Sequence, residues 1–200
     1  MSFNTEALIL ASASHTRQNM FRAAKLSFQS VIPDVDEQAI HTKLSHLNPK
    51  SLAGILAQTK ALSVSKQFPE RFVVGADQTL EFESQVRHKA KSPNEAIENL
   101  RLMNGKSHKL HAAVSVVVNG KFRYKHTSTA TLKMRILSED FIKTYAQSEQ
   151  EALLTSVGGY FYEGAGIHLF EKISGNIHTI LGLPLLPLLA FLRKQAILTP

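Results

Sequence analysis

Asp77 is the carboxylate whose position most favours a chemical role. It follows the apolar run Val73-Val74-Gly75-Ala76, which is expected to form a buried strand. In open α/β sheets, ligands and catalytic groups collect at the ends of strands. A carboxylate placed there binds a divalent metal or takes a proton from water. An aspartate that caps a turn has the same signature, so this segment alone leaves both interpretations open.

A small hydroxylated segment precedes the first expected helix. Ser12-Ala13-Ser14 lies between the apolar run 8–10 and a helical pattern from Arg17 to about Lys25. Hydroxyls and free backbone N–H groups at a helix N-terminus hold phosphate, and Arg17, one turn in, adds a charged fork. The same residues also make an ordinary helix cap. The segment is neither a P-loop nor a dinucleotide-binding glycine fingerprint.

Two lysines and a pair of acids are further candidates. Lys60 and Lys89 are of the type that pairs with phosphate, and Lys89 stands in a basic run with His88 and Lys91. Asp36-Glu37 suits Mg²⁺, which prefers few carboxylates, several waters and substrate phosphates. Solvated side chains remain the alternative for each of these residues taken singly.

The composition limits the chemistry available. Cysteine is absent, which excludes disulfide scaffolds, cysteine-ligated zinc, iron–sulfur clusters and thiol nucleophiles, and fits a reducing compartment. His108 and His111 lack the glutamate of a zinc-binding helix, and the chain has no Gly-x-Ser-x-Gly elbow. Catalysis must therefore use oxygen groups, nitrogen groups or a hard metal.

The elements that position these residues indicate one mixed α/β domain over residues 1–200, folded as two lobes around a cleft. With 44% hydrophobic and 20% charged residues, the chain has enough apolar material for a sizeable core. Asn119-Gly120 predicts a hairpin turn, and six of the ten glycines fall between Gly158 and Gly182, where the backbone must turn tightly. The expected helices cover about 17–25, 51–67, 92–102, 138–147 and the end of 181–192, and the strands cover 8–10, 71–76, 111–118 and 122–137.

The chain carries an excess of basic residues and shows no sign of a secretory signal or a membrane-spanning segment. Lys and Arg exceed Asp and Glu by 23 to 16, which favours anionic partners such as nucleic acid, nucleotides or acidic membranes. The segment 1–6 lacks the basic flank of a secretory signal, and 181–192 is too short for a bilayer span and contains two prolines. The expectation is a cytoplasmic chain without a membrane segment.

The order of the motifs resembles the Maf family of nucleotide pyrophosphatases, also called septum formation inhibitor proteins, over essentially the whole chain. The resemblance is carried by Leu10-Ala11-Ser12-Ala13-Ser14-x-x-Arg17, Lys60-Ala61, Gly75-Ala76-Asp77-Gln78, Lys89, Gly105-x-x-His108, Gly158-Gly159-Tyr160-x-x-Glu163-Gly164-x-Gly166 and Leu181-Gly182-Leu183-Pro184-Leu185. It implies an elongated fold like that of inosine triphosphate pyrophosphatases, usually dimeric. It also implies hydrolysis of a nucleoside triphosphate to monophosphate and pyrophosphate with a divalent metal, Mg²⁺ or Mn²⁺.

The resemblance also implies roles for single residues. Asp77 matches the family's catalytic carboxylate, the base for the attacking water, and with Glu37 it is expected to hold the metal. The residues expected to contact substrate are Ser12, Ser14, Arg17, Lys60, Gln78, Lys89 and Glu163. Such a set suits attack at the α-phosphate, where a metal and cations offset charge and a carboxylate orients water.

Departures from the family pattern bear on substrate and activity. Thr16, Asn19, Ala112 and Thr155-Ser156 replace residues usual in the family. Gln78 and Glu163 resemble the branch associated with 7-methyl-GTP, whereas Thr and Gln are typical of the dTTP and UTP branch. A single carboxylate accepts both the N1–H and N2–H₂ donors of guanine, so Glu163 favours a guanine nucleotide, methylated or ordinary, over a pyrimidine.

Other classes of function remain open at this point. A nucleic-acid-binding module would use the net charge of +7, but the chain shows no RNP-like aromatic strand or recognition-helix signature. A catalytically weakened family member with a regulatory role would explain the departures. The favoured prediction is an enzyme that acts on a nucleoside triphosphate as a homodimer, without stable nucleic-acid binding.

Overall fold

The computed structural model describes residues 8–198, and its framework is a seven-stranded mixed sheet. The strand order is β2-β1-β3-β5-β6-β7, and β4 also pairs with β3. The strands are β1 (Leu8–Ala11), β2 (Gln29–Val31), β3 (Phe72–Phe82), β4 (Gln85–Arg87), β5 (Ser107–Val118), β6 (Lys121–Met134) and β7 (Phe170–Ser174). The mixed α/β class expected from the sequence is confirmed. The segment 1–6, on which the expectation about a secretory signal depends, lies outside the described residues.

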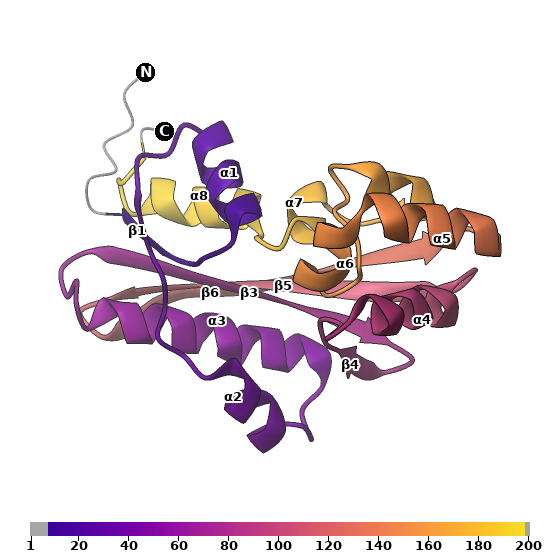
Figure 1. The fold of residues 1–200 in the computed structure, drawn as a ribbon. Coiled ribbons are helices and arrows are strands. Elements are labelled where there is room, and N and C mark those ends of the chain that lie inside the picture. The colour runs from indigo at the N-terminus through magenta and orange to yellow at the C-terminus, as the bar shows by residue number, and fades with distance from the viewer. Residues whose placement is uncertain (1–7, 199–200) are drawn as a thin grey trace.

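Helices cover both faces of this sheet (Figure 1). On one face lie α2 (Glu37–Lys43) and the long α3 (Pro49–Ser65), and on the other lie α1 (His15–Ala23), α7 (Ile177–Ile180) and α8 (Leu185–Lys194). The remaining helices are α4 (Pro93–Met103), α5 (Glu139–Ser148), α6 (Gln150–Thr155) and the 3₁₀ turn η1 (Ala165–Leu169), at the far end of the sheet from α1 and α8. Within the described residues, no helix is both long and apolar enough to cross a bilayer.

Local sequence signals account for the ends of several elements. Ser14, Ser92 and Ser138 cap α1, α4 and α5, each accepting a hydrogen bond from a backbone N–H three residues on. The hairpin turn between β5 and β6 is also confirmed, because Asn119 and Gly120 have φ values of 52° and 67°. The strands β5 and β6 pair antiparallel, as expected.

The strand that carries Asp77 is longer than the sequence predicts, and this is a correction. The expected strand stops at Ala76, whereas β3 continues to Phe82, so Asp77 lies inside the strand and not at its end. The reason is non-local: β5 pairs with β3 from Val73 to Glu81, and this long partner keeps the polar stretch extended.

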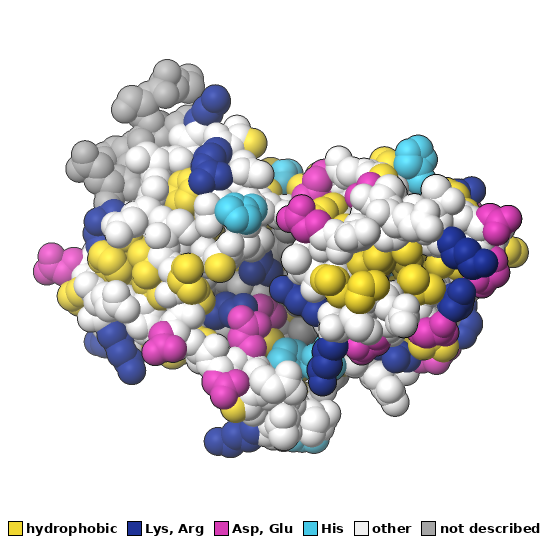
Figure 2. Space-filling view, viewed as in Figure 1, with side chains coloured by type: hydrophobic (Ala, Val, Ile, Leu, Met, Phe, Trp, Pro, Cys, Tyr) yellow, Lys and Arg dark blue, Asp and Glu magenta, His cyan; other side chains and the backbone are white. Residues whose placement is uncertain are grey.

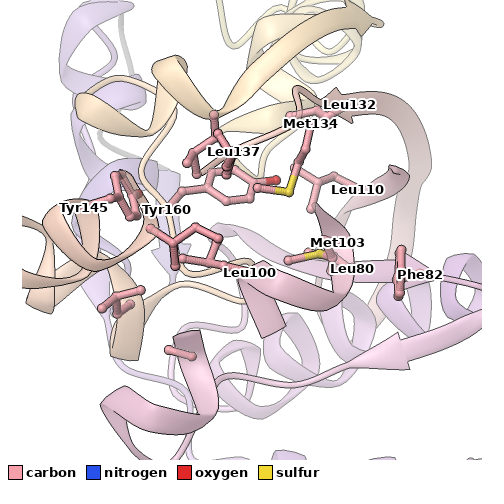
Figure 3. Packing of buried hydrophobic residues seen from close by; sticks show 14 of the residues in the cluster. Leu80, Phe82, Leu100, Met103, Leu110, Leu132, Met134, Leu137, Tyr145 and Tyr160 are labelled. Atoms are coloured by element: carbon pink, nitrogen blue, oxygen red, sulfur yellow. The ribbon is translucent and has the colours of Figure 1, made fainter. Parts of the chain in front are cut away.

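Two apolar clusters divide the molecule into lobes that share β3. Val74 and Ala76 belong to the cluster around β1, α1 and α8. Leu80 and Phe82 belong to the cluster at the other end of the sheet, where Leu100, Tyr145 and Tyr160 from different segments pack together (Figure 3). The polar residues between these pairs therefore lie at the junction of the lobes, which is where a ligand site is expected.

His108 is a buried titratable group in the second cluster, and it makes stability depend on pH. Its Nε2 lies 2.7 Å from the Tyr160 hydroxyl, and burial lowers the pKa of His108 to about 4. Because this is below the ordinary 6.5, the unfolded chain binds the proton more tightly. The stabilisation is complete above pH 6.5 and is lost as the pH falls from 6.5 toward 4.

We expect the free energy of unfolding to fall more steeply with acid in the wild type than in His108→Gln. Between about pH 7.5 and about pH 5, the wild type should lose roughly 2 kcal/mol more of its free energy of unfolding than the variant, from about 1.4 kcal/mol per pKa unit. Urea unfolding at the two pH values measures it. The other histidines are common to both proteins. An equal loss of the free energy of unfolding in the two proteins would therefore show that the pKa of His108 is not lowered by folding.

Candidate active site

The edge of β3 is interrupted, and the interruption creates the site. β1 pairs in parallel with β3 as far as Gly75, and β4 pairs antiparallel with the same strand from Leu80 to Phe82. Because β5 occupies the opposite edge, β1 and β4 share one edge and leave the segment 76–79 between them unpaired on that side. Both strands run toward this gap, so the residues that follow them converge on Asp77.

A cleft of about 1010 Å³ opens at this gap between the lobes. Figure 2 shows the hollow, with Lys and Arg side chains on both of its sides and acidic side chains between them. All of the residues expected to act on the substrate or metal line this one cleft: Ser12, Ser14, Arg17, Glu37, Lys60, Asp77, Gln78, Lys89 and Glu163. The structure thus brings together residues spread over 152 positions of sequence, from 12 to 163.

Asp77, Lys60 and Glu37 form the polar centre of the cleft. Lys60 Nζ lies 2.5 Å from Asp77 Oδ1 and 2.8 Å from Glu37 Oε1. Asp77 and Lys60 are only 5% and 6% exposed, whereas the Glu37 side chain is 49% exposed. A buried charge requires a partner, and removing one partner of such a pair typically costs about 3–5 kcal/mol. The cluster has one cation for two carboxylates, so it is net acidic.

Close packing of α3 on β3 aims Lys60 at Asp77. Gly75 faces α3, and a Cβ there would lie 2.3 Å from the Ala57 carbonyl oxygen and 2.6 Å from the Ala61 nitrogen. Only a glycine permits this approach. Since Asp77 points to the same face as Gly75, the side chain of Lys60, one residue before Ala61, meets it directly.

The same two carboxylates form a donor set that fits a divalent cation. Asp77 and Glu37 converge on a single cation, the Lys60 ammonium, which shows that both oxygens reach one point. Mg²⁺ requires few protein carboxylates when waters and substrate phosphates complete its shell. Among the described residues, no group of three or more His, Cys, Asp or Glu side chains is placed to hold a metal ion.

The N-terminus of α1 forms the wall beside β1. Ser12 Oγ accepts a hydrogen bond from the Ser14 backbone N–H at 3.1 Å, and Ser14 Oγ caps the helix by accepting one from the Arg17 N–H at 3.4 Å. The capping interpretation is therefore confirmed for Ser14, and both serines also line the cleft. His15 and Thr16, the first residues of α1, also line the cleft, and the N-terminus of a helix suits an anion.

Arg17 is fixed by the glycine that follows α7. Its Nε donates to the Gly182 carbonyl at 2.9 Å. Burial lowers the pKa of Arg17, while attraction by Asp77 and Glu37 opposes the shift, and an arginine stays charged at neutral pH. Its other guanidinium N–H groups make no hydrogen bond to a described residue, so they are available to a ligand in the cleft.

Gln78 joins the sheet to the carboxyl end of α7. Its Nε2 donates to the carbonyls of Thr179 and Ile180 at 2.8 and 2.9 Å. A Cβ at Gly182, whose φ is +91°, would lie 3.6 Å from Gln78 Oε1. Both amide hydrogens are thus used within the chain, and Oε1 is the atom of this side chain that remains for a ligand.

Glu163 closes the cleft from the glycine-rich loop of the other lobe. Its Oε1 accepts a hydrogen bond from Thr16 Oγ1 at 3.2 Å, across the cleft. The loop is held at Tyr160, whose N–H donates to Ser156 Oγ at 2.7 Å. Two of the departures from the family pattern, Thr16 and Ser156, therefore have defined structural roles. A third, Asn19, accepts a hydrogen bond from Arg22.

Lys89 lines the cleft on an exposed stretch after β4, without contacting the central cluster. Sequence reasoning missed its neighbour Arg87, the last residue of β4, which also lines the cleft. It also missed Gln38 and His41 on α2; the His41 ring lies 4.7 Å from that of His88, edge to face. Their positions in the sequence could have indicated them, because Gln38 and His41 follow Glu37 at helical spacing and Arg87 begins the basic run that contains Lys89.

The fold and the cleft define a two-lobed α/β protein with a carboxylate–lysine cluster between its lobes. The chain belongs to the Maf family: the family model, described as "Maf-like protein", matches residues 7–195. The resemblance expected from the motifs is confirmed.

Named relatives agree with this membership. The chain is 44% identical to the "Nucleoside triphosphate pyrophosphatase" of Nitrobacter winogradskyi, over 98% of this chain and 96% of that protein. It is 45% identical to the "7-methyl-GTP pyrophosphatase" of Bartonella henselae, over 94% of this chain and 95% of that protein. Among solved structures, a Staphylococcus aureus Ham1 protein gives a TM-score of 0.42 at 17% identity, over 65% of this chain and 71% of that chain.

Proposed function

We propose that this chain, a nucleoside triphosphate pyrophosphatase by family, acts on a guanine nucleotide, with 7-methyl-GTP preferred, and releases the monophosphate and pyrophosphate. The observation that carries the proposal is that Glu163 lines the same cleft as the Asp77–Lys60–Glu37 cluster and the N-terminus of α1. A base recognised at Glu163 and phosphates held at α1 therefore fit one bound molecule.

The reaction follows from the residues around the gap. Lys60 holds Oδ1 of Asp77 and leaves Oδ2 to accept a proton from water. The water oxygen bonds to the α-phosphorus, and the bond from that phosphorus to the bridging oxygen of the pyrophosphate breaks. The leaving group departs with the bonding electrons. Arg17 and the helix N–H groups stabilise the charge that develops on the phosphates.

A divalent cation, Mg²⁺ or Mn²⁺, fits this proposal at Asp77 and Glu37. When bound, it would supply charge neutralisation for the triphosphate. Both carboxylates contact Lys60 in this structure, each through one oxygen, so the cation and the ammonium would share the same two side chains.

Relatives with both printed names match this chain about equally, so the choice of base rests on residue chemistry. One carboxylate accepts the two parallel donors of guanine, and pyrimidine bases do not present that pair. The positive charge of 7-methylguanine strengthens the attraction to Glu163. Phe161 and Tyr162, adjacent in the loop, also line the cleft and supply apolar surface for a base.

Steady-state kinetics with 7-methyl-GTP, GTP, UTP and dTTP test the proposed substrate. The wild type should show the highest kcat/KM for the guanine nucleotides. Glu163→Gln should lower that value by about 10–100-fold, the equivalent of about 1.5–3 kcal/mol for a hydrogen bond to a charged group, and should change the pyrimidine values far less.

The control for that substitution is Glu171→Gln, which removes a carboxylate that pairs with Lys133 outside the cleft. This control substitution should leave kcat/KM unchanged for all four nucleotides. A wild type that prefers the pyrimidines would overturn the guanine assignment. Nucleotide binding without any turnover would support the regulatory alternative, and sedimentation analysis tests the expected homodimer.

A further inference from the structure

Arg87 is a cation on the cleft wall that the proposed reaction has not used. It is the last residue of β4 and pairs with Leu80, at the point where the β3 edge becomes free. The strand runs toward the gap, so Arg87 stands at the side of the gap opposite the N-terminus of α1. Arg87 is one of the residues that line the cleft.

The guanidinium of Arg87 has no anionic partner among the described residues. Its Nε is buried and makes no hydrogen bond there, and no described carboxylate lies within ion-pair distance. Its Cζ lies 5.3 Å from the centroid of the Phe82 ring. Lys106 lies at the same distance from that ring but is neutralised by Glu83 at 2.9 Å. Buried polar groups are normally satisfied, so an unpartnered nitrogen on a cleft wall calls for an explanation.

Packing against Phe82 does not provide that explanation. A guanidinium contacts an aromatic ring through its face, and its five N–H donors lie in the plane. Because Nε of Arg87 is buried, the terminal N–H groups of the fork are the donors left for a ligand. A guanidinium fork matches the oxygens of phosphate groups better than an ammonium does.

The distribution of charge in the cleft also favours a phosphate-binding role for Arg87. Lys60 is already paired with two carboxylates, so it contributes no net positive charge toward a polyphosphate. Four of the Lys and Arg residues that line the cleft have no carboxylate partner among the described residues. Arg17 lies on one side of the gap, and Arg87, Lys89 and Lys91 lie on the other. A triphosphate whose α-phosphate lies near Arg17 and Asp77 would therefore have its β- and γ-phosphates attracted toward Arg87.

We propose that Arg87 binds the departing pyrophosphate directly, on the cleft wall opposite the N-terminus of α1. This inference rests on the proposed function, because it assigns the β- and γ-phosphates to the Arg87 side of the cleft. The α-phosphate then lies beside Asp77, between the two walls.

Direct binding of inorganic pyrophosphate, measured by calorimetry, tests Arg87 without requiring turnover. Arg87→Gln should weaken pyrophosphate binding by about 10-fold or more, from the loss of a charge-assisted hydrogen bond of at least about 1.4 kcal/mol, and Arg87→Lys should weaken it less. Binding of guanosine monophosphate should be unchanged, because it lacks the leaving group.

Arg71→Gln is the matched control. Arg71 also has a buried Nε without a partner among the described residues, but it does not line the cleft. Arg71→Gln should therefore bind pyrophosphate as the wild type does.

The proposal is overturned if pyrophosphate does not bind the wild type, if Arg87→Gln binds it within twofold of the wild type, or if Arg71→Gln or monophosphate binding shows the same loss. A wild type that binds pyrophosphate through Arg87 yet hydrolyses no nucleoside triphosphate would refute the proposed function and leave this site standing.

Discussion

Asp77→Asn is expected to lower kcat by about 10³-fold, within the range for a lost general base, with a much smaller change in KM. The substitution keeps the size of the side chain and an oxygen for Lys60, but removes the charge that accepts a proton from water. Because Lys60 keeps its contact with Glu37, the fold should persist. The measurement is the turnover of 7-methyl-GTP with each protein, alongside thermal unfolding.

The control for Asp77 is Asp140→Asn, which changes an exposed aspartate in the first turn of α5. It should retain wild-type turnover. A folded Asp77→Asn protein with undiminished kcat would remove Asp77 from the catalytic role and leave it as a structural partner of Lys60.

Gly75→Ala is expected to destabilise the protein by about 3 kcal/mol, at the upper end of the range for overpacking a core. The new Cβ would meet backbone atoms of α3, the Ala57 carbonyl and the Ala61 nitrogen, and not the flexible end of a side chain. The helix must therefore move away from β3. Since Lys60 lies on that helix, the protein that remains folded should also lose activity. Chemical denaturation and kinetics on the same preparation measure both effects.

The same helix offers the control for Gly75. At Gly54 in α3 an added Cβ would lie 3.7 Å from the nearest atom, Thr127 Oγ1, which is an ordinary contact. Gly54→Ala should be neutral or should stabilise by up to about 1 kcal/mol, because alanine favours helix. Equal losses at the two glycines would show that α3 does not depend on close approach at Gly75.

The parts of the fold that could be predicted are those set by neighbours in sequence. The caps at Ser14, Ser92 and Ser138 and the turn at Asn119-Gly120 follow from side chains and backbone within a few residues. Motif order was sufficient to place the expected site residues together, because the family resemblance carries long-range information that local patterns lack.

The parts that could not be predicted depend on pairing between distant segments. The extension of β3 beyond Ala76 comes from β5, and the free edge at 76–79 comes from where β1 and β4 happen to stop. The hydrogen bond between Thr16 and Glu163 likewise joins residues from opposite lobes. No period or spacing in the sequence encodes such contacts.

The most direct test of the account is the position of an oxygen label after hydrolysis of 7-methyl-GTP in ¹⁸O-water. Attack at the α-phosphorus beside Asp77 predicts that mass spectrometry finds one ¹⁸O in the nucleoside monophosphate and none in the released pyrophosphate. Label in the pyrophosphate, or products that are a diphosphate and inorganic phosphate, would contradict the account.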